Sequence, residues 1–270
     1  MQVYHIDSNQ VNIDIITAEG DLHHHLSRVL RIKNGEELRF SDGVNYYDTI
    51  CRELTKGCSS HEIISKYPVD DEPGVKITLL QGYPRGDKAD TIVKRCTELG
   101  VTTMRFCGSD NSQVKIKGKE EQKRERLQKV ADSAAEQCGR GVIPEILMPC
   151  SLKEAVESVK ELNNTHIIFC YERENKQGFK SLITSLKDSG CRSLAVIIGP
   201  EGGFSKEEAD YILAQGGHAV TLGKRILRTE TAAPAVAAAI MCQYDEWETL
   251  GNTDLREADL KALAKEGDND

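Results

Sequence analysis

The chain has 270 residues, which is enough for one large domain or two smaller ones with a sizeable core. Its net charge of -8 and pI of about 5.5, taken alone, argue against a nucleic-acid partner, although a local basic patch is what phosphates contact. With 39% hydrophobic and 29% charged residues, the composition is that of a folded protein. It holds no long apolar run, so we expect a cytoplasmic protein without a membrane span.

The nine cysteines are scattered, and no two of them form a C-x-x-C pair. This pattern predicts reduced thiols in a cytosolic protein rather than a disulfide framework or a zinc site. The run His23-His24-His25 does not change that prediction, because three adjacent side chains cannot all point at one ion. We therefore predict no metal site.

Residues 1–72 are predicted to form a small domain of short strands. Residues 11–17 alternate between polar and apolar, and residues 35–54 are typical of two strands joined by a turn at 41–43. A helical period is visible only around residues 23–32. Prolines, acids and a glycine in 67–76 mark a domain boundary. We expect a β-barrel-like fold here.

Residues 73–250 alternate between strand and helix patterns, which predicts an α/β domain with a mostly parallel sheet. The pairs Ser151–Glu154 and Ser205–Glu208 form capping boxes, which mark helix starts. The acidic residues 251–270 are expected to be a frayed tail. The predicted strands are 75–82, 101–107, 165–171, 193–199 and 218–223, and the main predicted helices are 87–100, 119–139, 151–162 and 231–247.

A glycine-rich turn, "GPEGGF" (199–204), follows one of the buried strands. In doubly wound α/β sheets, ligands bind beyond the carboxyl ends of strands. The turn lacks both the lysine of a Walker A loop and the G-x-G-x-x-G spacing, and Glu201 would repel a pyrophosphate. A neutral or cationic ligand, such as adenosine joined to a sulfonium, fits better. The alternative is a tight turn whose glycines only supply positive φ.

A second loop, "LGKRILRTETAAPA" (222–235), also follows a predicted strand. Thr231 is predicted to cap the alanine-rich helix after it. Arg228 should face the same crevice as Gly202 and Gly203, because the two loops leave one sheet at the same edge. Two such loops indicate a ligand site more specifically than either loop alone.

These two motifs, together with residues 24–38, 94–101 and 133–146, resemble the SPOUT class of S-adenosylmethionine-dependent RNA methyltransferases. More narrowly, they resemble the RsmE family, which methylates N3 of a uridine in small-subunit (16S) ribosomal RNA. The resemblance implies a PUA-like barrel that presents RNA, an α/β domain with a trefoil knot, and a homodimer. Two departures stand out: Asn111 replaces a usual arginine, and the N-terminus lacks an Arg-Phe pair.

The resemblance also implies a cofactor site in which backbone groups of the loops hold the adenine. Arg228 is the candidate catalytic residue, stabilising the uridine anion, with a phosphate or dimer contact as the alternative. Glu201 is expected to hold its loop rather than face the sulfonium. The residues implied to bind S-adenosylmethionine are Tyr171, Gly199, Pro200, Glu201, Gly202, Gly203, Leu222, Gly223, Ile226, Leu227, Arg228, Thr231 and Ala232.

Basic residues outside those loops are the candidates for contacts with RNA phosphates. Two other functions remain open: methylation of another RNA position or of a transfer RNA, and a non-catalytic RNA-binding role in ribosome assembly. The candidate RNA-binding residues are Arg28, Arg31, Lys33, Arg85 and Lys88.

Overall fold

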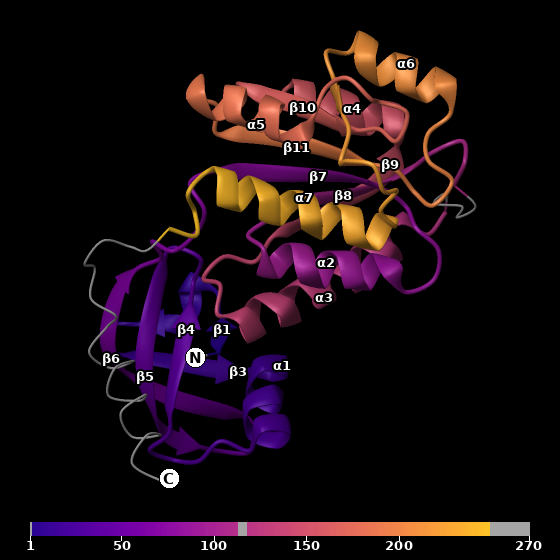
Figure 1. Ribbon diagram of the computed structural model, residues 1–270. Coiled ribbons are helices and arrows are strands. Elements are labelled where there is room, and N and C mark those ends of the chain that lie inside the picture. Colours follow the sequence, from indigo (N-terminus) through magenta and orange to yellow (C-terminus); the bar gives the residue numbers. More distant parts are fainter. Residues whose placement is uncertain (1, 113–117, 249–270) are drawn as a thin grey trace, which may run out of the picture.

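The computed structural model describes residues 2–112 and 118–248, which form two units, each built on its own sheet. Figure 1 shows the N-terminal sheet below the larger α/β unit, with the helices α2 and α3 between the larger sheet and the N-terminal unit. The predicted acidic tail, 251–270, lies outside the described residues. Within those residues, no helix has both the length and the apolar character needed to cross a bilayer.

The N-terminal sheet has six strands in the order β1-β4-β5-β6-β3-β2. Only β1 and β4 are parallel, and β4 and β5 form the predicted hairpin. Among the described residues β1 and β2 do not pair, so the strand pairing does not close into the predicted barrel. The strands are β1 (Val3–His5), β2 (Val11–Asn12), β3 (Ile15–Glu19), β4 (Glu37–Ser41), β5 (Asn45–Leu54) and β6 (Cys58–Pro68).

The sheet bends around its own apolar core. In Figure 1, β3 runs across the direction of β4 and β5. Ile16, Leu26 and Phe40 are fully buried in this core. Leu26 comes from the predicted helical stretch, which is a short α-helix followed by a π-helical turn. The helical segments of this unit are η1 (Ser8–Gln10), α1 (Gly20–His24) and η2 (His25–Leu30).

The second sheet is parallel throughout, in the order β12-β10-β11-β7-β8-β9, which confirms the predicted α/β class. The edge strand β9 escaped prediction because Pro149 interrupts its pattern, and an edge strand tolerates the missing N–H. The strands are β7 (Lys76–Gly82), β8 (Thr103–Gly108), β9 (Glu145–Ser151), β10 (Thr165–Cys170), β11 (Ser193–Ile198) and β12 (His218–Val220).

Helices cover both faces of this sheet, which explains the continuous apolar runs of its central strands. One apolar cluster joins the sheet to α2, α3, α5 and α7, and a second joins the opposite face to α4 and α6. Both predicted capping boxes are confirmed, whereas α5 was not predicted. The helices are α2 (Lys88–Glu98), α3 (Glu120–Cys138), α4 (Leu152–Lys160), α5 (Phe179–Asp188), α6 (Lys206–Ala214) and α7 (Thr229–Gln243).

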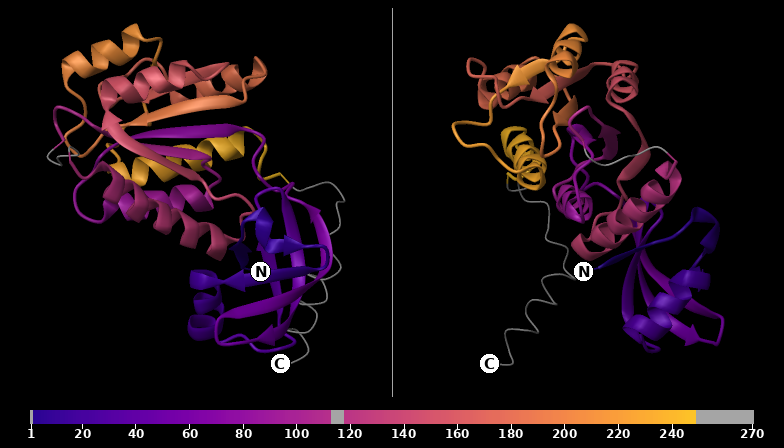
Figure 2. Two further views of the ribbon diagram at one scale, coloured as in Figure 1. Left: turned by 180° about the vertical axis from the view of Figure 1, so that it is seen from behind. Right: turned by 90° about the vertical axis from the view of Figure 1, so that its right-hand side faces the viewer.

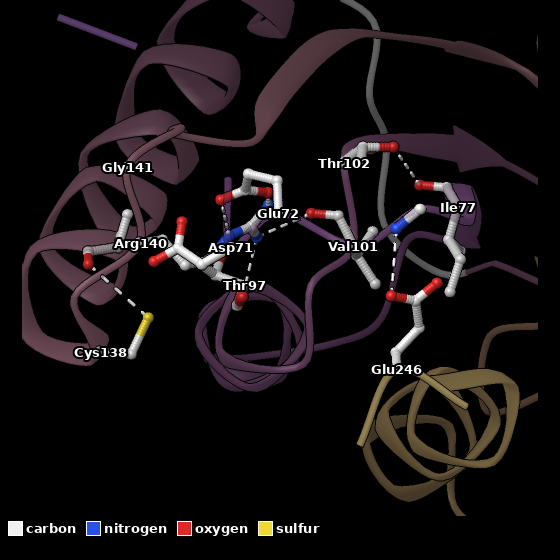
Figure 3. Close-up of polar contacts among 12 residues, drawn as sticks. Asp71, Glu72, Ile77, Thr97, Val101, Thr102, Cys138, Arg140, Gly141 and Glu246 are labelled. Carbon is white, nitrogen blue, oxygen red and sulfur yellow. Dashed lines mark hydrogen bonds and ion pairs between the residues drawn. The ribbon is translucent and has the colours of Figure 1, made fainter. Parts of the chain in front are cut away.

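Arg140 fastens the linker between the two units to the larger one (Figure 3). Its guanidinium pairs with Glu72 and donates to the carbonyls of Thr97 and Val101 at 2.9 and 3.0 Å. From the other side, the Glu246 carboxylate accepts two backbone N–H groups of the same linker. These contacts fix the linker to the larger unit. The two units themselves meet where α3 approaches β1 (Figure 2).

Candidate functional site

A cavity of about 470 Å³ lies at the carboxyl ends of β10, β11 and β12. Its walls come from the three loops that follow these strands and from the start of α7. Every residue that the sequence predicted for the cofactor site lines this cavity, except Thr231. The lining residues that were not assigned to that site are Lys88, Cys170, Glu172, Ile198, Thr221, Arg225 and Thr229.

The glycines of the turn after β11 serve both backbone conformation and close packing. Gly203 has a φ of +65°, in the left-handed region that favours glycine, and its N–H donates to the carbonyl of Pro200 at 3.0 Å. A Cβ at Gly202 would stand 2.8 Å from the backbone oxygen of Asn111, whose Nδ2 donates to the Gly202 carbonyl at 3.1 Å. A side chain at Gly202 would therefore press on the Asn111 backbone, and one at Gly203 would have to adopt a left-handed φ that is strained for residues other than glycine.

Buried hydrogen bonds of Thr229 and Gln81 join the start of α7 to β7 and to the turn after β11. The Thr229 hydroxyl donates to the Gly199 carbonyl at 2.7 Å and accepts from Gln81 Nε2 at 2.8 Å. Gln81 is fully buried at the end of β7. The sequence analysis did not predict this pair. A glutamine near the end of an otherwise apolar strand does indicate a buried side chain that needs a hydrogen-bond partner.

Helix α7 begins at Thr229, two residues before the predicted start. The N-cap is Arg228, and its backbone carbonyl accepts from the N–H groups of Thr231 and Ala232, both at 2.8 Å. The prediction that Thr231 caps the helix is therefore wrong. Its side chain is exposed on the first helical turn and lies outside the cavity lining.

Glu201 is held by the start of α2. Its Oε1 accepts from Lys88 Nζ at 2.7 Å and from the Arg85 N–H at 3.2 Å. Burial alone would raise the pKa of Glu201, but these hydrogen bonds outweigh burial and hold the pKa below its ordinary value. The carboxylate is thus ionised at neutral pH and braces the turn.

The candidate RNA-binding residues fall into two places. Arg28, Arg31 and Lys33 are exposed on η2 and the chain that follows it, in the N-terminal unit. Arg85 is exposed beside the cavity, whereas Lys88 is half-buried in the cavity wall. The candidate catalytic residue, Arg228, is exposed and belongs to the cavity lining.

Comparison with known proteins agrees with this geometry. Residues 71–241 match the model of a family described as RNA methyltransferase domain. A relative from Bacillus subtilis, named ribosomal RNA small subunit methyltransferase E, is 30% identical over 257 residues, which cover 91% of this chain and 98% of that protein. A relative of the same name from Synechocystis is 32% identical over 80% of this chain and 69% of its own length.

Two solved structures share the fold across both units. One is a ribosomal RNA small subunit methyltransferase E from Neisseria gonorrhoeae bound to S-adenosylmethionine, with a TM-score of 0.79 and 28% identity over 90% of this chain and 98% of that one. The other is a methyltransferase from Legionella pneumophila in complex with S-adenosylmethionine, with a TM-score of 0.78 and 28% identity over 89% and 96%.

Proposed function

We propose that this chain transfers the methyl group of S-adenosylmethionine to N3 of a uridine in small-subunit (16S) ribosomal RNA. The chain belongs to the family of ribosomal RNA small subunit methyltransferases E. The observation that carries the proposal is the cavity built from three strand-end loops. Its volume of about 470 Å³ suits a nucleoside-sized ligand.

The cavity residues fit such a cofactor. Gly202 and Gly203 keep the turn free of side chains, so that backbone donors and acceptors can approach an adenine edge. Glu201 adds negative charge at the wall, and its ion pair with Lys88 offsets part of that charge. The residues proposed to hold the cofactor are Tyr171, Gly199, Pro200, Glu201, Gly202, Gly203, Leu222, Gly223, Ile226, Leu227, Arg228 and Ala232.

In the proposed reaction, uridine N3 would take the methyl group from S-adenosylmethionine, the neutral thioether S-adenosylhomocysteine would leave, and the N3 proton would pass to solvent. The cofactor supplies an activated methyl group on a sulfonium. The cavity walls contribute by aligning that methyl group with the nucleophile. Arg228, exposed at the cavity's edge, is the proposed stabiliser of negative charge on the uridine.

We also propose that the loops around the cavity form a trefoil knot. The segment after β12 runs beside the loop after β10: the Thr221 N–H donates to the Gln177 carbonyl at 2.9 Å, and the Phe179 N–H to the Thr221 carbonyl at 3.2 Å. A few residues later, Thr229 bonds Gly199 in the turn after β11. These contacts support a threaded path that brings all three loops to one site.

The proposed domain division is 1–72, a PUA-like RNA-binding domain, and 73–250, the methyltransferase domain. Arg28, Arg31 and Lys33 give the first domain an exposed basic group, and Arg85 gives the second one beside the cavity. RNA-modifying enzymes act on bases outside the stack, so contacts from both domains would hold the strand on either side of the target. We further propose a cytoplasmic homodimer.

Calorimetry with S-adenosylhomocysteine tests the cofactor site. Wild-type protein should bind, and Gly202→Asp should abolish binding because its Cβ would strike the Asn111 backbone. The matched control is Gly57→Asp, where a Cβ would meet no atom of residues 2–112 or 118–248 within 4 Å. Binding that persists in Gly202→Asp would contradict the assignment.

Mass mapping of RNA from a deletion strain tests the target. Loss of one N3-methyluridine from small-subunit rRNA supports the proposed reaction. Loss of a methyl group elsewhere in rRNA or from a transfer RNA would redirect it to another substrate. Cofactor binding without any lost methylation would favour an assembly factor.

A further inference from the structure

Lys88 occupies an unexpected position for a residue predicted to contact RNA. It is the first residue of α2, and only 33% of its side chain is exposed. Its ammonium lies 2.7 Å from Glu201 Oε1 and 3.6 Å from Glu230 Oε2. Glu201 belongs to the turn after β11 and Glu230 to the first turn of α7. One cation therefore bridges three segments that surround the cavity.

The two carboxylates depend on that cation. The side chains of Glu201 and Glu230 are only 29% and 17% exposed, so water screens their charges incompletely. Within the part of the chain that the structure describes, the buried Oε2 of Glu230 has no hydrogen-bond donor, and the Lys88 ammonium is the cation paired with it. Removing the ammonium would leave two carboxylates from different loops facing the same space.

Building on the function proposed above, we propose that Lys88 is a positioning residue of the cofactor site: it locks the glycine turn to the start of α7 and does not bind RNA. A phosphate contact would require an ammonium free to reach solvent, and this one is engaged by Glu201 and Glu230. Arg85, three residues earlier and exposed, is placed for the phosphate contact instead.

The decisive variant is Lys88→Met, which keeps the aliphatic stem and removes the charge. We expect the dissociation constant for S-adenosylhomocysteine to rise about tenfold, as for coupled charges in contact. At saturating cofactor, the KM for RNA and its salt dependence should stay unchanged. Adding Glu230→Gln to Lys88→Met should recover much of the affinity, because one of the two repelling charges is then gone.

Arg85→Met is the matched control. Its backbone N–H still donates to Glu201, so cofactor affinity should stay the same, while the KM for RNA rises and its salt dependence becomes shallower. If Lys88→Met instead behaves like this control, with unchanged cofactor affinity and weaker RNA binding, Lys88 is an RNA contact and the inference is overturned.

Hydrogen exchange on the cofactor-free protein provides a readout that does not depend on the proposed function. Lys88→Met should speed exchange of the amides in 201–203 and at the start of α7, with no change in the β4–β5 hairpin. Unaltered exchange in those segments would refute the positioning role. If the wild-type protein fails to bind S-adenosylhomocysteine while Lys88→Met still speeds exchange in these segments, the proposed function is refuted and the positioning role of Lys88 stands.

Discussion

Gly82→Ala is the substitution for which the structure predicts the sharpest effect. Gly82 is the buried last residue of β7, and it faces Pro200 in the glycine turn. A Cβ at Gly82 would stand 2.5 Å from the Pro200 nitrogen and closer still to its Cδ, well short of the 3.4 Å at which ordinary contact begins. Neither atom can rotate away, because one is backbone and the other belongs to a ring. The turn itself must move.

The expected cost follows from overpacking. Inserting a methyl group into a close-packed site costs roughly 1–3 kcal/mol, and the gain from replacing glycine in a strand offsets about 0.5–1 kcal/mol of it. We expect a net loss of about 1 kcal/mol in the free energy of unfolding. For a chain of this size, that loss lowers Tm by roughly 2–4 °C. Because the displaced turn walls the cavity, affinity for S-adenosylhomocysteine should fall as well.

Thermal unfolding followed by circular dichroism, with calorimetry on the folded protein, measures both effects. Gly57→Ala is the control, since a Cβ there meets no atom within 4 Å in the part of the chain that the structure describes, and should change Tm and affinity little. A Gly82→Ala protein with the Tm and cofactor affinity of the wild type would refute the reasoning, because it would show that the turn is not packed against β7.

Three further predictions concern buried polar groups. Thr229→Val removes the hydroxyl that joins Gly199 to β7, and should lower the free energy of unfolding by about 1–3 kcal/mol in urea titrations and weaken cofactor binding. Arg140→Met leaves Glu72 and two carbonyls unpaired; we expect a loss of about 3 kcal/mol and faster proteolysis of the linker, and unchanged proteolysis would contradict its fastening role. Burial, with a smaller contribution from a neighbouring histidine, lowers the pKa of His61 to about 4. As the pH falls, the imidazole therefore takes up a proton in the unfolded state before it does so in the folded state. His61 alone should therefore cost about 3 kcal/mol of stability as the pH drops from about 6.5 to 4, and His61→Gln should remove that share in pH-resolved denaturation curves. Burial also lowers the pKa of His5 to about 4, so the share of His5 should remain in the variant.

Local patterns in the sequence determined much of the secondary structure and the general place of the site. The helical spacing of Ala89, Ile92, Val93 and Cys96 placed α2, and these side chains are fully buried. The capping box at Ser151 placed the start of α4. Such signals are readable because helix periodicity and caps involve residues three or four positions apart. The glycine turn was readable for a similar reason, since it directly follows an apolar strand.

Only the tertiary structure decided how the site is held together. Lys88 and Glu201 are 113 positions apart, and Gln81 and Thr229 are 148 apart, so no local pattern relates them. The sequence grouped Lys88 with Arg85 as a basic cluster for RNA, and only the structure shows its ion pairs with Glu201 and Glu230. The sequence also named Thr231 as the cap, although α7 begins at Thr229. Folding brings three loops to one edge of a parallel sheet, and long-range hydrogen bonds and ion pairs then select which polar side chains face the cavity.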